Sequence, residues 1–322
     1  MKKDLKNLRI GVFRGGVSSE RDISLISGQS VIEALLKRGY KVVDLDLKTK
    51  DENEIMKMIN RNRVDIAFIA LHGQFGEDGG IQRILERNSL PFTGAGSYSS
   101  ALAMDKIETL KVLKQNNIPV PEYWIEDEGL PLFSDRDFPL VVKPHCAGSS
   151  IGVNIVKDVS LLQKALGEAK KYSTRVIVER YIEGRELTAA IVGQEVLPVV
   201  EIVFNKELFD FFSKYDDDLT QFIVPAQVPK KVYKLIQDLA YRVYKILACR
   251  HFGRIDFRID KKNNPYVLEL NSIPGLTSHS LLPLAAKEAG LTFEGLCERI
   301  LNQALEEHIA EGFYEESAQK KN

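Results

Sequence analysis

Short apolar runs alternate with longer stretches of helical periodicity between Leu8 and about residue 100. The runs that predict strands are Leu8 to Phe13, Tyr40 to Leu47 and Asp65 to Leu71. Helices are expected between them, over Ser18 to Lys37 and over Glu52 to Asn62, where apolar residues recur at helical spacing. The third run is almost wholly apolar, which fits a strand buried on both faces. This alternation of strand and helix predicts a doubly wound parallel sheet.

The pattern changes after about residue 105, where strands of mixed polarity predict a second unit with more antiparallel pairing. These strands are Pro139 to Lys143, Ile151 to Val156 and Val176 to Glu179, with a helix over Ser160 to Lys171. A hairpin is expected from Leu187 to Val192 through a turn at Gly193-Gln194 to Val196 to Val203. The fold class is therefore α/β, with an α+β character in the C-terminal half.

The last third of the chain begins with a long amphipathic helix, expected over Pro229 to Ala248. A second hairpin follows, in which Gly253 to Asp260 pairs with Tyr266 to Asn271. A closing helix is expected over Phe293 to Glu306, and the polar residues from 311 to 322 predict a frayed, flexible tail.

Composition restricts the classes of function. The 322 residues carry 44 Lys and Arg against 45 Asp and Glu, so the net charge of -1 gives no reason to expect a nucleic acid as the main ligand. The longest apolar runs, such as Ile66 to Leu71, fall far below the roughly 20 residues of a bilayer crossing. No membrane partner is expected, and a cytoplasmic location is predicted. Cys146, Cys249 and Cys297 are widely spaced without a Cys-x-x-Cys pair, which favours free thiols over a disulfide framework or a zinc knuckle.

The second hairpin carries the most informative chemistry. Residues two apart in a strand share a face, so Arg254 projects with Asp256, and Glu269 projects with Asn271. Carboxylate and amide oxygens are the ligands that Mg²⁺ prefers, and an arginine beside them complements a phosphate. Taken alone, these two segments are also consistent with an exposed, salt-bridged hairpin that binds no ligand.

Two loops add to this picture. The turn-rich run from Asn271 to Ser280 offers backbone N–H groups and hydroxyls that can receive an anion. The glycine- and serine-rich loop from Lys143 to Gly152 can fold over phosphate groups, although surface hairpins use the same residues. It is not a Walker A loop, because the Gly-x-x-x-x-Gly-Lys-Ser/Thr spacing is absent.

The order of these strings along residues 8 to 305 resembles the D-alanine:D-alanine ligase family of the ATP-grasp superfamily. The segments that carry the resemblance are Gly15 to Ser24, Ala70 to Gly73, Gly76 to Gly79, Pro91 to Gly94, Met104 to Lys106, the loop around Ser149, Lys214-Tyr215, Pro225-Ala226 and the hairpin through Ser280-Leu281. The resemblance implies an N-terminal Rossmann-like domain over 1–100 and a two-lobed ATP-grasp fold, with a central subdomain over 101–182 and a C-terminal domain over 183–310. It also implies ATP-dependent ligation of two D-alanine molecules through an acyl phosphate, for peptidoglycan precursor synthesis, by a cytoplasmic homodimer.

The resemblance also implies roles for individual residues. Those that match ATP-contacting positions are Lys106, Lys143, Glu179, Arg180, Tyr181, Ile182 and Glu186. Those that match ligands of two Mg²⁺ ions, for which Mn²⁺ is expected to substitute, are Asp256, Glu269 and Asn271. Those that match substrate-binding and catalytic positions are Glu20, His72, Ser149, Lys214, Tyr215, Arg254, Gly275, Ser280 and Leu281.

Within the substrate set, Glu20 matches the acid that holds the ammonium of the first D-alanine, with Ser149 and Tyr215 as its hydrogen-bonded partners. Arg254 and the Gly275 N–H match the oxyanion stabilisers, and Ser280 with Leu281 matches the site of the second carboxylate. Lys214 and Tyr215 lie in a charged run that otherwise predicts a solvated loop, and a histidine such as His72 at a strand end is commonly structural.

One segment departs from the family pattern. His145-Cys146-Ala147 stands where the family loop carries a more polar, often acidic residue before the glycine. Three alternatives to the dipeptide ligase are a D-alanine:D-lactate ligase, another ATP-grasp amino-acid ligase and an inactive nucleotide sensor. The sensor is disfavoured because Asp256, Glu269 and Asn271 are all present.

Overall fold

The computed structural model describes residues 5–148, 150–204, 220–277 and 279–319. Its first layer is the predicted parallel sheet, whose three strands have the order β2-β1-β3. The strands are β1 (Arg9–Gly15), β2 (Lys41–Leu47) and β3 (Ile66–Ile69), joined by α1 (Arg21–Lys37) and α2 (Glu52–Asn62). Every residue of β3 is buried, which explains its unbroken apolar sequence.

A second, four-stranded antiparallel sheet has the order β4-β7-β5-β6. It consists of β4 (Tyr123–Ile125), β5 (Leu140–Pro144), β6 (Asn154–Val156) and β7 (Val176–Arg180), covered by α6 (Leu162–Ala169). β6 begins later than predicted, because the residues before it form turns in which Ser150 and Gly152 have positive φ. α6 is also shorter than predicted, since a 3₁₀ turn over Val159–Leu161 precedes it.

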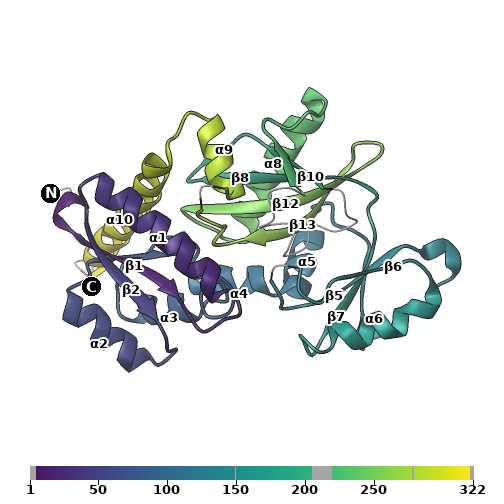
Figure 1. The fold of residues 1–322 in the computed structure, drawn as a ribbon, viewed down its shortest axis with the longest axis horizontal. Helices are drawn as coiled ribbons and strands as arrows, with labels where there is room; N and C mark the ends of the chain where they lie inside the picture. Colours follow the sequence, from purple (N-terminus) through teal and green to yellow (C-terminus); the bar gives the residue numbers. More distant parts are fainter. Residues whose placement is uncertain (1–4, 149, 205–219, 278, 320–322) are drawn as a thin grey trace.

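The largest sheet lies between the other two along the molecule (Figure 1). Its strand order is β11-β10-β8-β12-β13, with β9 paired to β8, and α8 (Lys230–Ile246) packs against it. Its strands are β8 (Gly184–Val192), β9 (Glu195–Val196), β10 (Val200–Phe204), β11 (Thr220–Ile223), β12 (Phe252–Asp260) and β13 (Pro265–Asn271). The strand predicted over Val196 to Val203 is split into β9 and β10 around Pro198, whose nitrogen cannot donate to the ladder.

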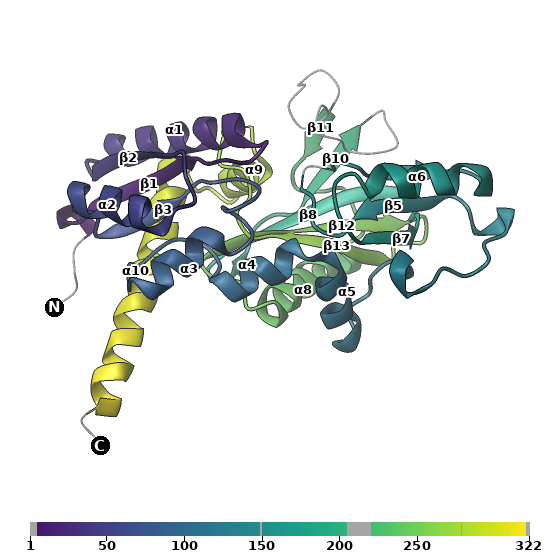
Figure 2. The same ribbon diagram turned by 90° about the horizontal axis from the view of Figure 1, so that it is seen from below.

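Helices connect and close these layers. They are α3 (Gly80–Arg87), α4 (Ser97–Met104), α5 (Lys106–Gln115), α9 (Leu281–Glu288) and α10 (Phe293–Gln319), with further 3₁₀ turns at Leu5–Asn7, Glu126–Glu128 and Asp135–Asp137. α10 returns to the N-terminal sheet and lies beside α1 (Figure 2). It also contacts the end of β8 in the largest sheet, where Arg299 donates to the Val192 carbonyl. Its helical backbone continues well past Glu306, where the sequence pattern predicted its end. No helix among the described residues has the length and apolarity that a bilayer crossing requires.

Candidate active site

A cavity of about 130 Å³ lies between the four-stranded sheet and the largest sheet. Its wall contains every residue expected at the nucleotide, namely Lys106, Lys143, Glu179, Arg180, Tyr181, Ile182 and Glu186. Lys143 and Glu179 come from adjacent strands β5 and β7 and form an ion pair of 2.7 Å. The structure therefore brings together residues that are scattered over three segments of the sequence.

Lys106 stands at the N-terminus of α5 and points into this cavity. Its Nζ donates to the Ala147 carbonyl at 3.0 Å and pairs with Glu269 at 3.1 Å. Burial lowers the pKa of Lys106, but the charge and hydrogen bond of Glu269 outweigh it, so the pKa is raised overall. The side chain is thus held as a cation, the form that complements a phosphate.

The residues proposed as metal ligands occupy one face of β12 and β13. Arg254 pairs with Asn271 and Asp256 pairs with Glu269 in the antiparallel ladder, and a β-bulge follows directly after Asp256. Arg254 donates two hydrogen bonds to Asp256, at 2.9 and 2.8 Å, and Asn271 Nδ2 donates a third at 2.9 Å. Burial lowers the pKa of Arg254, whereas the charge of Asp256 raises it, and the net shift is upward.

This donor set fits a hard divalent cation. Two carboxylates and one amide oxygen lie at neighbouring ladder positions, and Asn271 uses its nitrogen, not its oxygen, toward Asp256. Oxygen ligands of this kind, completed by phosphate oxygens and water, are what Mg²⁺ requires.

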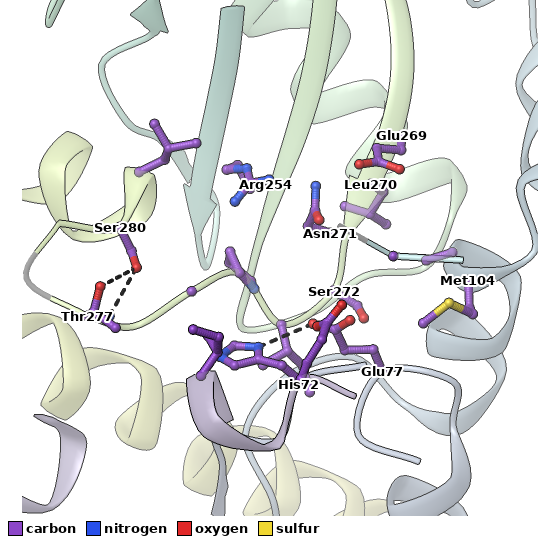
Figure 3. Close-up of a pocket in the computed structure, with 18 of the residues that line it drawn as sticks. His72, Glu77, Met104, Arg254, Glu269, Leu270, Asn271, Ser272, Thr277 and Ser280 are labelled. Atoms are coloured by element: carbon purple, nitrogen blue, oxygen red, sulfur yellow. Dashed lines mark hydrogen bonds and ion pairs between the residues drawn. The ribbon is translucent and has the colours of Figure 1, made fainter. Parts of the chain in front are cut away.

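A larger cavity of about 350 Å³ adjoins the first one at these strands and extends toward the N-terminal sheet (Figure 3). The predicted residues in its wall are Glu20, His72, Arg254, Asn271, Gly275, Ser280 and Leu281. In Figure 3, His72 and Glu77 face Arg254 and Asn271 across the cavity. His72 is 5% exposed, and its ring nitrogens contact Ser27 Oγ at 2.8 Å and Glu77 Oε1 at 3.4 Å. Its ring is therefore oriented by neighbours on both sides.

The far wall of the larger cavity is the loop before α9. Ser280 precedes this helix, and its Oγ accepts from the Thr277 N–H at 3.1 Å and contacts Thr277 Oγ1 at 2.9 Å. A Cβ added at Gly275 would lie 2.7 Å from Ser280 Oγ, so the loop can close this tightly only around a glycine. The turn-rich run noted in the sequence thus presents hydroxyls and backbone N–H groups to the cavity.

The two cavities meet at Lys106 and Glu269, which line both of them. Between them runs the glycine-rich loop, with Gly148 facing the larger cavity and Ala147 and Ser150 facing the smaller one. A Cβ added at Gly148 would lie 3.0 Å from Glu20 Oε1, which places this loop next to the predicted ammonium-binding acid. Ser149, Lys214 and Tyr215 lie outside the described residues, so their predicted roles stay predictions.

Three residues at the site were not assigned from the sequence, and they are Thr188, Arg258 and Glu77. Thr188, 1% exposed, donates to Asp256 Oδ1 at 2.6 Å. Arg258 donates to the Ile182 carbonyl, the Tyr181 hydroxyl and Glu186 at 3.1 to 3.3 Å. Arg258 could have been found, because it continues the alternation of Arg254 and Asp256 along one strand face. Glu77 lay in a quoted segment, Gly76 to Gly79, whereas Thr188 gave no signal because it sits on another strand.

Comparisons with known proteins agree with this geometry. Family models described as the D-ala D-ala ligase N-terminus and C-terminus match residues 46–95 and 113–302. The chain is 43% identical to a D-alanine--D-alanine ligase of Desulforudis audaxviator, over 92% of this chain and 99% of that protein. It is 41% identical to the D-alanine--D-alanine ligase of Carboxydothermus hydrogenoformans, over 93% of this chain and 99% of that protein.

The solved structures of a D-alanine--D-alanine ligase from Bacillus anthracis are similar throughout. One has a TM-score of 0.83 at 36% identity, and the other, complexed with ATP, has a TM-score of 0.82 at 34% identity. Both alignments cover 94% of this chain and 99% of the other. With the two cavities and their shared lysine and glutamate, these similarities show that the chain belongs to the D-alanine--D-alanine ligase family.

Proposed function

We propose that the protein ligates two molecules of D-alanine, using ATP, through an acyl-phosphate intermediate. The observation that carries this proposal is the junction of the two cavities at Lys106 and Glu269. A nucleotide in the smaller cavity would present its terminal phosphate there, toward an amino acid in the larger cavity. The curated relatives described above are dipeptide ligases, so the ester-forming alternative with D-lactate is not favoured.

ATP is proposed for the smaller cavity because its walls supply the groups that a nucleotide needs. Lys106 and Lys143 provide positive charge for the phosphates, and Glu186, which Arg258 contacts, provides an acceptor for the ribose hydroxyls. The B. anthracis relative that shares the fold was solved in complex with ATP.

Asp256, Glu269 and Asn271 would hold two Mg²⁺ ions, with Mn²⁺ as a substitute. When bound, such ions neutralise charge on the phosphate oxygens. Arg254 lies beside this set, where its guanidinium can face the transferred phosphoryl group while Asp256 fixes its orientation.

The first step would transfer the γ-phosphoryl group to a carboxylate oxygen of the first D-alanine, breaking the bond between the β- and γ-phosphates. Glu20 would hold the ammonium group of this molecule. The neutral amine of the second D-alanine would then attack the acyl carbon, phosphate would leave with the C–O bond electrons, and the nitrogen would lose a proton. Arg254 and the Gly275 N–H would face the oxyanion, and Ser280 would bind the second carboxylate.

The test is phosphate release from ATP with D-alanine, L-alanine or D-lactate, with products identified by mass spectrometry. We expect D-alanine to support release and to yield the dipeptide. L-alanine should support little because, with its ammonium and carboxylate held in the same places, its methyl group would take the position that hydrogen has in the D-enantiomer. Equal release with both enantiomers, or an ester as the main product of a D-alanine and D-lactate mixture, would contradict the proposal.

A further inference from the structure

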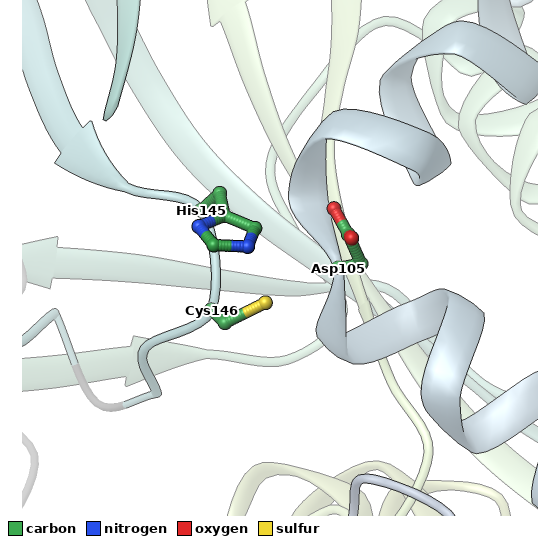
Figure 4. Close-up of side chains that lie close together, drawn as sticks. All are labelled: Asp105, His145 and Cys146. Atoms are coloured by element: carbon green, nitrogen blue, oxygen red, sulfur yellow. The ribbon is translucent and has the colours of Figure 1, made fainter. Parts of the chain in front are cut away.

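Three side chains of types that bind zinc gather outside the cavities described above. Asp105, His145 and Cys146 each offer one ligand atom, and these atoms all lie within 4.8 Å of one another. Asp105 comes from the turn between α4 and α5, whereas His145 and Cys146 follow β5 (Figure 4). This is the segment that we expected, from the sequence, to depart from the family pattern.

His145 is oriented as a metal-binding histidine. Its Nδ1 lies 3.3 Å from the Arg175 carbonyl and within hydrogen-bond distance of Ser173 Oγ. A carbonyl can only accept, so a proton on Nδ1 would satisfy this contact and leave the lone pair of Nε2 for a cation. A histidine ligand whose other nitrogen donates to a backbone carbonyl is the usual arrangement around zinc.

The other two ligands are also held in place. Asp105 Oδ1 caps α5 by accepting from Ile107 N at 3.0 Å and Glu108 N at 3.2 Å, which fixes the carboxylate. Among the described residues, the second oxygen accepts no such bond from the backbone. The Lys106 N–H donates to the His145 carbonyl at 3.0 Å and ties the two segments together. Cys146 is a free, exposed thiol, so a cation can reach it from solvent.

We propose that Asp105, His145 and Cys146 bind one soft divalent cation of the zinc type, with water as the fourth ligand. On binding, Cys146 would lose its proton to solvent and form a metal–sulfur bond, since the thiolate is the ligand. Thiolate and imidazole select zinc-type ions over Mg²⁺, whose ligands are oxygens. The site is therefore distinct from the oxygen-rich set of Asp256, Glu269 and Asn271.

A cation at this location would affect turnover, and this consequence rests on the proposed function. Cys146 directly precedes Ala147 and Gly148, which line the two cavities, and Lys106 directly follows Asp105. A cation that joins Asp105 to Cys146 would hold this loop against the start of α5. Exchange of nucleotide should then slow, so that zinc inhibits turnover even when Mg²⁺ is saturating.

Binding can be tested independently of activity. The full chain, in excess Mg²⁺, is titrated with Co²⁺ as a spectroscopic probe, and the thiolate-to-cobalt charge-transfer band in the near ultraviolet is followed. We expect one equivalent to bind with this band. Cys146→Ala should abolish the band, and Asp105→Asn and His145→Ala should each weaken binding by at least about tenfold.

Two control variants separate this site from others. Cys249→Ala removes a buried thiol elsewhere, and Asp256→Asn alters the proposed magnesium ligands, so both should keep the band. Absence of the band in the unaltered protein, its persistence in Cys146→Ala, or its loss in Asp256→Asn would overturn the proposal. If binding holds but Mg²⁺-saturated turnover is indifferent to zinc, the metal site stands and its inhibitory consequence is wrong.

A measurement on the unaltered protein avoids any effect of substitution on folding. Alkylation of Cys146 is followed by peptide mass spectrometry with and without stoichiometric Zn²⁺ in excess Mg²⁺. Zn²⁺ should slow alkylation of Cys146 by at least about tenfold, because the metal-bound sulfur is no longer a free thiolate. Equal rates of Cys146 alkylation with and without Zn²⁺ would also overturn the proposed metal site.

Discussion

At the residue scale, Glu269 belongs both to the proposed magnesium ligands and to the surroundings of Lys106, the proposed phosphate-binding lysine. It lies opposite Asp256 in the ladder, pairs with Lys106 and borders both cavities. Its charge therefore affects both the proposed cation and Lys106, the lysine that we propose to bind phosphate.

Glu269→Gln should abolish most turnover while the fold remains intact. The change removes one carboxylate charge from the proposed metal ligands, and a loss of about 3 kcal/mol or more in transition-state stabilisation corresponds to at least about 100-fold in kcat. Phosphate release measures the effect, and circular dichroism checks the fold. Glu168→Gln, on the exposed surface of α6, is the control and should retain normal activity. A Glu269→Gln variant with more than half of the original rate would remove this residue from the metal site.

Thr188 acts through Asp256, to which its hydroxyl donates at 2.6 Å. Thr188→Val preserves shape but leaves the carboxylate without this bond, so we expect the Mg²⁺ concentration for half-maximal activity to rise by about tenfold or more. Thr188→Ser retains a hydroxyl and should restore the original Mg²⁺ requirement. If valine lowered kcat with an unchanged Mg²⁺ requirement, the residue would serve folding rather than the metal ligands.

At the element scale, the start of α9 depends on the close approach of Gly275 to Ser280. The loop that precedes the helix and the first residues of the helix both border the larger cavity. A shift of this turn would therefore move Ser280 and Leu281 together.

Gly275→Ala should raise the KM for D-alanine by at least about tenfold with little change in thermal stability. The added Cβ would lie 2.7 Å from Ser280 Oγ and 3.3 Å from Ser280 Cβ, so either Ser280 Oγ rotates away from Thr277 or the turn opens. A displacement of about 1 Å in a positioning group is enough for losses of this size. Gly167→Ala, where nothing lies within 4 Å, is the matched control. Unchanged KM in Gly275→Ala would show that the loop adapts without moving the carboxylate site.

At the scale of the whole molecule, the C-terminal helix completes the N-terminal unit. α10 places Leu296, Ile300 and Leu301, all fully buried, in the same core as β1 and α1. Lys37 pairs with Glu294 at 2.5 Å and Arg38 pairs with Glu298 at 2.7 Å, so the start of α10 is joined to the end of α1. The homodimer and the exact domain boundaries expected from the sequence stay predictions.

Ile300→Ala should lower the free energy of unfolding by about 2 to 5 kcal/mol, because it leaves a cavity in this shared core. Urea denaturation followed by circular dichroism measures the change. Glu306→Ala, on the exposed face of the same helix, should alter stability by less than about 0.5 kcal/mol. Similar effects of the two substitutions would mean that α10 contributes little to the N-terminal core.

The sequence by itself determined the features that depend on local order. Strand periodicity placed Arg254 beside Asp256 and Glu269 beside Asn271, and alternating apolar runs indicated the parallel sheet, because both follow from backbone geometry within a few residues. Its family resemblance also identified the residues that line the nucleotide cavity. Only the tertiary structure decided that α10 returns to α1, that Thr188 supports Asp256, and that Asp105 meets His145 and Cys146. These contacts join segments remote in sequence, and which buried surfaces meet depends on packing of the whole chain, which no local periodicity records.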